Sequence, residues 1–198
     1  MDASSGQSVV GTAEKPFLMP VEDVFRLRQG RVVMPTGRIE RGRVRKGDAV
    51  EIIGLGGSAT ALVEGIEQHG MSIAEAGAEM NVGVLLRGIA ADAVERGQVL
   101  AAPGSVGAHT GFTADITLLS EEQGSADVVS GERLCFYTRT AVVWGTVTLP
   151  AGAETVRPYH GAEVTVVLEE PVALEEGQPF AFRHHGRAAG SGTVMRLP

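Results

Sequence analysis

The sequence has little cysteine and few aromatic residues, and the shortage of cysteine excludes two kinds of site. Cys135 is the one cysteine among 198 residues, which excludes an internal disulfide framework and a zinc site built from several thiolates. Its place in the alternating run RLCFYTRT predicts a buried strand position in the core, not an exposed nucleophile. Aromatic residues make up 5% of the chain, whereas hydrophobic residues make up 43%, which is enough for well-formed cores.

Long hydrophobic segments are also missing. Residues 1–14 show no basic start followed by an apolar stretch, so they do not read as a signal peptide. No apolar run approaches the roughly 20 residues that cross a bilayer. We therefore expect a soluble, cytoplasmic protein in which residues 1–14, which are small and polar, form a flexible tail.

A general excess of positive charge is absent. The net charge is −7, and residues 105–198 hold six basic against eleven acidic side chains. A protein that binds a phosphate backbone by charge needs a basic surface. Only the segment 26–46 offers one, as an RNA surface or simply as a solvated face, through Arg26, Arg28, Arg31, Arg38, Arg41, Arg43, Arg45 and Lys46.

Sequence signatures of catalysis are missing as well. There is no G-x-x-x-x-G-K-[ST] phosphate loop and no Gly-Lys dipeptide, so we expect no GTP site, no magnesium site and no other cofactor. No Ser/His/Asp set has a credible spacing, which predicts a protein that is not an enzyme and has no catalytic residue. His184 and His185 suggest a metal, but neighbouring strand residues point to opposite faces, so we expect a loop or rim there and no metal site.

Abundant turn residues and short alternating runs indicate the fold. With 27 glycines and nine prolines between apolar runs of period two, the chain is typical of many short strands. We predict an all-β protein of two tandem antiparallel β-barrels, over residues 15–104 and 105–198, divided within the glycine-rich stretch 101–111. Residues 23–34 read as one long strand, and 70–79 and 90–97 as single helical turns.

Several single positions carry their own expectations. Pro35 cannot donate a hydrogen bond to a sheet, so we expect a bulge there that redirects Thr36 and Arg38. Trp144 is expected in the core or at the interface between the barrels. Two acidic pairs, Glu169-Glu170 and Glu175-Glu176, flank Pro171 and a turn and are expected in a solvated loop.

Eight segments in order resemble the second and third domains of translation elongation factor Tu, over about residues 15–197. The resemblance implies two consecutive β-barrels of the translation-factor type, without the GTPase domain of that family. The segments are KPFLMPVEDVF (15–25), TGRIERG (36–42), GDAVEI (47–52), NVGVLLRGI (81–89), ERGQVLAAPG (95–104), FYTRT (136–140), GTVTLP (145–150) and GRAAGSG (186–192).

In that family, one side of the second domain receives the aminoacylated 3′ end of tRNA. The resemblance assigns Glu67 to the terminal ribose and Asn81 to the aminoacyl group, and His69 stands where the family has an aromatic residue. These groups suit the ligand, because an ammonium group and a ribose hydroxyl donate hydrogen bonds to carboxylates. The full set implied is Glu22, Asp23, Phe25, Thr36, Arg38, Glu67, His69 and Asn81. Weak contacts to the RNA backbone are expected from Arg41, Arg43, Arg45, Arg139 and Arg187, although Arg139 matches a family residue near the inter-domain or tRNA surface and a structural role is favoured for it.

Two functions follow from this sequence. The first is non-catalytic binding of aminoacyl-tRNA, or of another RNA 3′ end, by the first barrel. The second is a docking module that binds a GTPase, a nucleotide-exchange factor or a tRNA-using enzyme. Gly70 and Met71 replace basic residues of the family, which reduces the expected phosphate contacts and keeps the second function open. Neither a membrane nor DNA is an expected partner.

Overall fold

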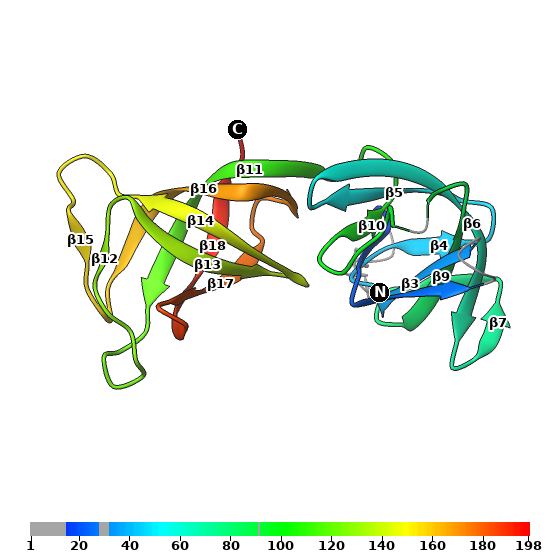
Figure 1. Ribbon diagram of the computed structural model, residues 1–198, viewed down its shortest axis with the longest axis horizontal. Helices are drawn as coiled ribbons and strands as arrows, with labels where there is room; N and C mark the ends of the chain where they lie inside the picture. Colours follow the sequence, from blue (N-terminus) through cyan, green and yellow to red (C-terminus); the bar gives the residue numbers. More distant parts are fainter. Residues whose placement is uncertain (1–14, 28–31, 91) are drawn as a thin grey trace, which may run out of the picture.

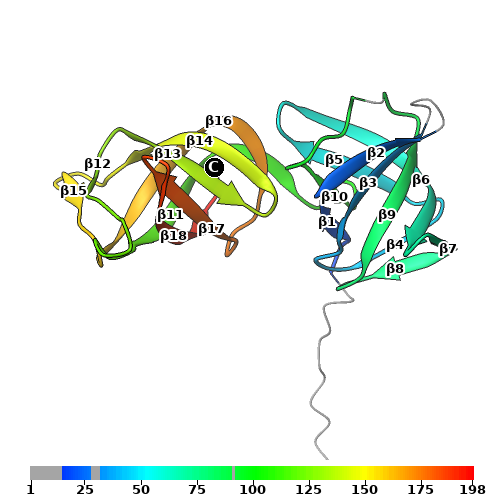
Figure 2. The same cartoon turned by 60° about the horizontal axis from the view of Figure 1, so that its bottom comes forward.

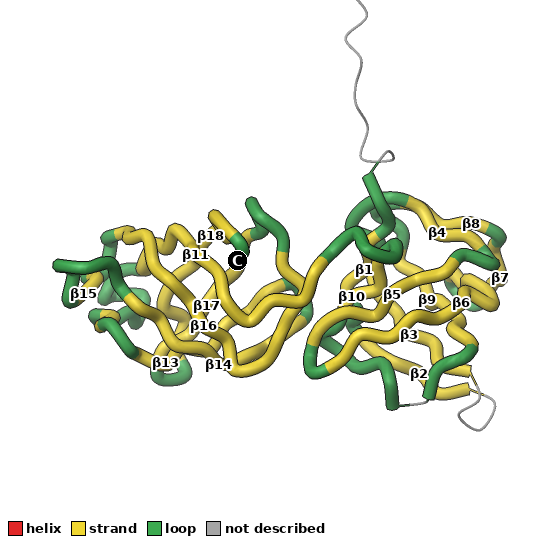
Figure 3. The backbone as a smooth tube through the Cα atoms, turned by 90° about the horizontal axis from the view of Figure 1, so that it is seen from above, coloured by secondary structure: helices red, strands yellow, loops and turns green. Residues whose placement is uncertain are grey.

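The chain folds into two antiparallel β units, one at each end of the long axis of the molecule (Figure 1). Strand β11 (Gly107–Leu118) leads from the first unit into the second. The computed structural model describes residues 15–27, 32–90 and 92–198. Strands and loops account for all of them, as Figure 3 shows, so the predicted all-β class is confirmed. Over the same residues no helix is long and apolar enough to cross a membrane. The predicted tail, residues 1–14, lies outside the described residues.

The first unit is a curved sheet in the order β1-β10-β5-β6-β9-β3-β2, with β7 paired to β6 and a small β4-β8 ladder beside it. Backbone hydrogen bonds from Leu18 N to Arg41 O (3.1 Å) and from Glu40 N to Leu18 O (2.9 Å) join β1 to the chain after β3. The strands are β1 (Leu18–Pro20), β2 (Asp23–Leu27), β3 (Val32–Arg38), β4 (Arg43–Arg45), β5 (Ala49–Gly54), β6 (Gly57–Gln68), β7 (Met71–Ile73), β8 (Glu75–Gly77), β9 (Asn81–Arg87) and β10 (Val99–Ala101).

The second unit is a closed barrel of β11-β16-β14-β13-β17-β18, with a separate β12-β15 ladder. Its alternation is regular: in β14 every second side chain, beginning with Ala141, is buried, because successive strand residues face opposite sides. The remaining strands are β12 (Val128–Val129), β13 (Glu132–Thr138), β14 (Ala141–Thr148), β15 (Thr155–Val156), β16 (Gly161–Leu174), β17 (Pro179–His184) and β18 (Arg187–Arg196).

Each unit has its own hydrophobic core, and the few aromatic residues are unevenly shared. Four phenylalanines pack together inside the second barrel, with ring centroids 5.5–6.4 Å apart; they are Phe112, Phe136, Phe180 and Phe182. The first core is largely aliphatic, with Ile39, Ile52, Ile66, Leu86 and Leu100 fully buried. Burial of a side chain of this size contributes about 1.5–3 kcal/mol.

Three local expectations are wrong. Residues 23–34 are not one strand, since β2 and β3 pair antiparallel, with Leu27 opposite Val32. The register across Pro35 is continuous with β2, so no bulge forms; the ladder to β9 is instead open between Val33 and Thr36, where the missing N–H does no harm. The described residues of 70–79 and 90–97 contain short strands and turns instead of helical turns.

An apolar cluster holds the two units together. Ile53, Val99 and Ala101 from the first unit pack with Ala173 from the second, and all four are at most 5% exposed. Beside them, Leu55 N donates to Pro171 O at 2.7 Å. The strand edge of one unit is therefore tied to the other by backbone and by buried side chains.

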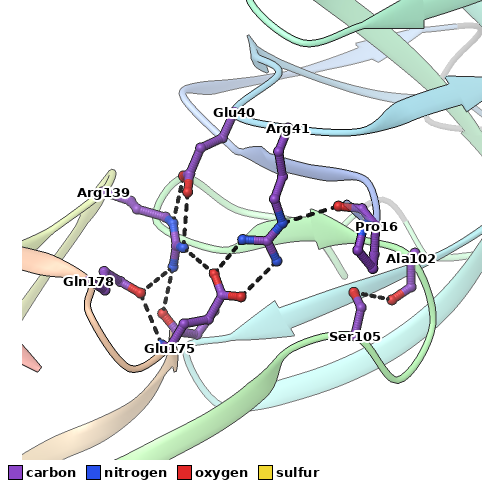
Figure 4. A network of polar contacts seen from close by, with 9 residues as sticks. Pro16, Glu40, Arg41, Ala102, Ser105, Arg139, Glu175 and Gln178 are labelled. Carbon is purple, nitrogen blue, oxygen red and sulfur yellow. Dashed lines mark hydrogen bonds and ion pairs between the residues drawn. The ribbon is translucent and has the colours of Figure 1, made fainter. Parts of the chain in front are cut away.

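A network of charges next to this cluster completes the interface (Figure 4). Both Glu175 oxygens accept hydrogen bonds from Arg41, each at 2.7 Å, and Glu175 also accepts one from Arg139 at 2.7 Å. Arg139 donates further to Glu40 (2.8 Å) and to Gln178 Oε1 (2.6 Å). The two arginine side chains are only 14% and 9% exposed, so the expectation that Glu175 lies in a solvated loop is wrong.

The pKa of Glu175 reflects this environment. Burial by itself raises the pKa of that carboxyl, but the hydrogen bonds and charge of Arg41, together with Arg139, outweigh burial and lower it below the ordinary value. The same hydrogen bonds, which Arg41 donates to the Glu175 carboxylate, raise the pKa of Arg41. Glu175 is therefore ionised in the folded protein and holds two guanidinium groups, one from each unit.

Removing the charge of Glu175 will destabilise the protein. We expect Glu175→Gln to lower the free energy of unfolding by about 2–3 kcal/mol, because two half-buried guanidinium groups lose their shared counter-charge. The neighbouring Glu176 is exposed and serves as the matched control; Glu176→Gln will change the value by less than about 0.5 kcal/mol. Urea unfolding measures both, and equal losses in the two variants would contradict the assigned role of Glu175.

The same carboxylate gives the stability a pH dependence. Its folded-state pKa lies below its unfolded value of about 4.3, so its contribution is present above that value and is lost as the pH falls through the folded pKa. The gap in unfolding free energy between wild type and Glu175→Gln will therefore be constant from pH 7 to about pH 5 and shrink below about pH 4. Urea unfolding at a series of pH values measures it, and a gap independent of pH would be the contrary result.

Candidate functional site

A hollow of about 350 Å³ opens on one side of the first unit, where β2, β3, β9 and β6 lie next to one another (Figure 2). Its size is within the range of small-ligand sites. Ten residues line it: Glu22, Met34, Thr36, Gly37, Glu67, His69, Gly70, Asn81, Val82 and Gly83.

Antiparallel register explains why residues far apart in the sequence meet there. Thr36 on β3 pairs with Gly83 on β9, and Gly83 pairs on its other side with Glu67 on β6. These three residues thus form one lateral row, and the next position along β3 and β9 that faces the same way pairs Arg38 with Asn81. Side chains of β3 and β6 stand on either side of the space that a glycine leaves.

Gly83 keeps the hollow open. A Cβ at Gly83 would meet Met34 Sδ at 2.9 Å and Cγ at 3.1 Å, so Met34 covers the glycine and forms part of the lining. Gly37 serves a different purpose, because a Cβ there would collide with the backbone carbonyl of Pro20. One glycine shapes the hollow, and the other allows β3 to pass close to β1.

The hollow is acidic and rich in acceptors. It contains two carboxylates, Glu22 and Glu67, and no lysine or arginine. Within the described residues, the side chains of Glu22, Glu67 and Asn81 have no hydrogen-bond or ion-pair partner. Acceptors left open toward a hollow suit a ligand that brings hydrogen-bond donors or a positive charge.

Two models of known protein families match this chain. The model of elongation factor Tu domain 2 matches residues 32–101. The model of the elongation factor Tu C-terminal domain matches residues 105–197. The chain belongs to the elongation factor Tu family. Together the two matches run from β3 to β18, and β1 and β2 precede the first of them.

Five of the eight aminoacyl-end residues assigned from the resemblance to elongation factor Tu line this one hollow. They are Glu22, Thr36, Glu67, His69 and Asn81. The other three lie beside it: Asp23 and Phe25 are exposed on β2, opposite Thr36 and Met34, and Arg38 is paired with Glu79. That these residues bind a ligand remains a prediction.

His69 reaches the hollow because of a tight turn. Gln68 pairs with Met71, and the two residues between them, His69 and Gly70, have φ angles of 50° and 77°. Positive φ at both central positions is the pattern of a type I′ hairpin turn, in which glycine is favoured and histidine is tolerated. The imidazole is thereby presented, exposed, at the edge of the hollow.

Most of the arginines expected to contact an RNA backbone in the manner of elongation factor Tu form ion pairs within the protein. Arg41 and Arg139 are largely enclosed in the network at the interface, where both pair with Glu175, so they have little charge or surface to offer RNA. Arg43 and Arg45 both pair with Glu75, and the hydrogen bonds from Arg45 and Arg43 lower the pKa of that carboxyl. Arg28 and Arg31 lie outside the described residues.

Arg187 is exposed on the second barrel, away from the hollow, and has no ion pair with another described residue. Among the five arginines expected to contact the RNA backbone, Arg187 is therefore the one whose charge has no acidic partner within the described residues. Within the described part of the basic segment, four arginines have acidic partners: Arg38, Arg41, Arg43 and Arg45.

Two single-residue expectations on the second barrel are corrected. Trp144 lies in neither the core nor the interface; it is 42% exposed on the outer face, with the Arg133 guanidinium 4.2 Å from its ring centroid. Cys135 is buried at 8% exposure, as expected, but faces outward between Trp144 and Arg183 and not into the phenylalanine core.

Sequence reasoning did not assign five of the lining residues, and two of these, Met34 and Gly83, shape the hollow together. Met34 precedes Pro35 and looks like an ordinary strand position, while Gly83 interrupts the apolar run of β9. A glycine inside a strand often marks close approach or a site where something must fit. Gly83 carries that signal, but the residues that lie beside it on the neighbouring strands can be identified only from the strand register.

Two glycine substitutions separate the roles of Gly83 and Gly37. We expect Gly83→Ala to change the unfolding free energy by less than about 1 kcal/mol, because the flexible end of Met34 can move aside. Gly37→Ala will cost at least about 3 kcal/mol, because the added methyl meets the Pro20 backbone. Thermal and urea unfolding measure both, and a large loss in Gly83→Ala would show that Met34 is rigidly held.

Proposed function

We propose that the chain binds an aminoacylated RNA 3′ end, that of aminoacyl-tRNA in the first instance, in the hollow of its first barrel, without chemistry of its own. The observation that carries this proposal is that Glu22, Thr36, Glu67, His69 and Asn81 line a single cavity. Membership in the elongation factor Tu family supports the choice of ligand.

The chemistry of the hollow matches such a ligand. The α-ammonium of an aminoacyl ester is positive and carries three donors, and the unpaired carboxylates offer it acceptors. Glu67, in the lateral row with Thr36, is placed to accept a hydrogen bond from a ribose hydroxyl, and His69 at the rim offers a ring for stacking on a base. A free RNA end lacks the ammonium group, so it brings no positive charge to offset the two carboxylates of the hollow.

Phosphate contacts have a small part in this proposal. Arg41, Arg43, Arg45 and Arg139 have acidic partners, so few cations are available to release counterions from RNA. The logarithm of the binding constant should therefore fall with the logarithm of salt concentration with a slope of only about −1 to −2. Recognition rests on the RNA terminus more than on its backbone.

Three variants test the proposal, and they differ in which of two RNAs they weaken. A fluorescent short RNA is titrated with the protein, once aminoacylated at its 3′ end and once free. Glu67→Gln will weaken both RNAs by about tenfold, because it removes a charged acceptor of the ribose. Glu22→Gln will weaken mainly the aminoacylated RNA, because it removes a charge facing the ammonium. Asn81→Ala will also weaken mainly the aminoacylated RNA.

The control is Glu121→Gln, which removes an exposed carboxylate of the second barrel and should leave both affinities unchanged. Equal affinity of wild type for the two RNAs with a steep salt slope would indicate binding to the RNA backbone instead. No binding of either RNA at micromolar protein would overturn the proposal.

A second candidate function, protein docking, is favoured by one observation. The outer face of the second barrel exposes Val142 (54%), Trp144 (42%) and Val167 (54%) on the neighbouring strands β14 and β16. Large apolar side chains gathered on a surface mark sites of association. If neither RNA binds in the titration above, this surface supports a partner protein as the ligand of the chain.

A further inference from the structure

One end of the second barrel holds a polar cluster that the proposed RNA site does not use. Glu132 begins β13, His184 ends β17, and His185 lies in the turn between β17 and β18. One ligand atom from each side chain lies within 4.8 Å of the other two. The described residues contain no other group of three such side chains so close together.

Strand alternation explains why two of these side chains meet. In β17 the inward positions are Phe180, Phe182 and then His184, and His184 is 6% exposed. In β13 Glu132 is on the same side as the inward Leu134 and Phe136. The carboxylate and the imidazole therefore both point inward at the mouth of the barrel, where the hydrophobic core ends.

The geometry of this pair is well defined. His184 Nε2 lies 2.6 Å from Glu132 Oε1, and Glu132 Oε2 accepts a hydrogen bond from Val129 N at 2.9 Å. The second bond holds the carboxylate in place from the adjacent turn. An outer hydrogen bond that orients a carboxylate is a regular feature of metal sites.

His185 adds a third donor through its backbone conformation. His185 and Gly186 have φ angles of 49° and 78°, so they form a tight hairpin turn of the same kind as His69-Gly70. The turn brings the two rings together, stacked with centroids 3.9 Å apart. The reasoning that neighbouring strand residues point to opposite faces fails here, because His185 is not in the strand, although it lies at the rim as expected.

We propose that Glu132, His184 and His185 bind a zinc ion at the mouth of the second barrel, with water as the fourth ligand. Two imidazoles and a carboxylate are an established zinc ligand set, and such a site leaves the fourth position open. His185 is exposed, so the ion has an entry path from the solvent on that side. His184 is buried and shields the ion from solvent on the other side. The ion ties the β12–β13 turn to the β17–β18 turn.

Small side-chain movements are enough to form this site. Ligand bonds near 2.0–2.1 Å in a tetrahedron place ligand atoms about 3.3 Å apart. The Glu132–His184 contact opens by about 0.7 Å from its hydrogen-bonded distance of 2.6 Å when zinc replaces the proton between them. The exposed His185 ring moves inward by rotation about its own side-chain bonds. The backbone stays as it is.

Metal titration of the intact chain tests the proposal. Protein freed of metal with a chelator is titrated with Co²⁺, whose tetrahedral complexes absorb strongly in the visible, and then with Zn²⁺ by calorimetry. Wild type should bind one ion per chain, show tetrahedral Co²⁺ bands and gain thermal stability with Zn²⁺. His185→Asn and Glu132→Gln should each weaken binding by at least about tenfold.

Asparagine is chosen at position 185 because it tolerates positive φ, so the turn is retained. His160→Asn is the matched control, since His160 is an exposed histidine of the same barrel outside the cluster; it should bind as wild type does. Binding no tighter than millimolar, or binding that His185→Asn leaves unchanged, overturns the proposal. Octahedral Co²⁺ spectra, or equal weakening by His160→Asn, overturn it as well.

Discussion

The carboxylate of Glu175 accepts hydrogen bonds from one arginine of each barrel, Arg41 and Arg139. This shared ion pair determines which basic side chains remain available on the surface. Arg41 and Arg139 give their hydrogen bonds to Glu175, Glu40 and Gln178, beside an apolar cluster that already joins the barrels. Because a half-buried ion pair costs desolvation, it is favourable only when its donors are satisfied, as they are here. The consequence is functional, since these arginines are withdrawn from any phosphate backbone.

With these arginines paired, the proposed recognition of an RNA end rests on the hollow of the first barrel. Gly83 lies between Thr36 and Glu67 in one lateral row, and the Met34 side chain covers it, so that these residues together form the floor and walls of the hollow. An acidic hollow repels phosphate and attracts an ammonium group, so the same feature that weakens general RNA binding favours an aminoacylated end. The pairing of these arginines and the acidic hollow thus support the same kind of proposed selectivity.

The class of fold and most strands could be predicted from the sequence, because alternation and glycine-rich turns are local signals. What could not be predicted depends on pairing across the sheet. The sequence of 28–31 carries only one glycine, so 23–34 read as one strand although β2 and β3 are separate, and Pro35 is tolerated because its partner ladder is open. The aminoacyl-end residues were reached through family resemblance; the loss of Arg41 and Arg139 to Glu175, 134 and 36 positions away, has no local signal.

Two turns of this chain show how far a local pattern determines a role. Both His69-Gly70 and His185-Gly186 form tight hairpin turns with positive φ, and both present an imidazole at a barrel rim. The first ring borders a hollow whose polar groups have no partner, whereas the second stacks on a buried histidine bound to a carboxylate. Since the dipeptide and the backbone are the same, the difference lies in the strands alongside. The turn sets where a side chain stands, and the strands around it determine the ligand that we propose for it, an RNA end for His69 and a metal ion for His185.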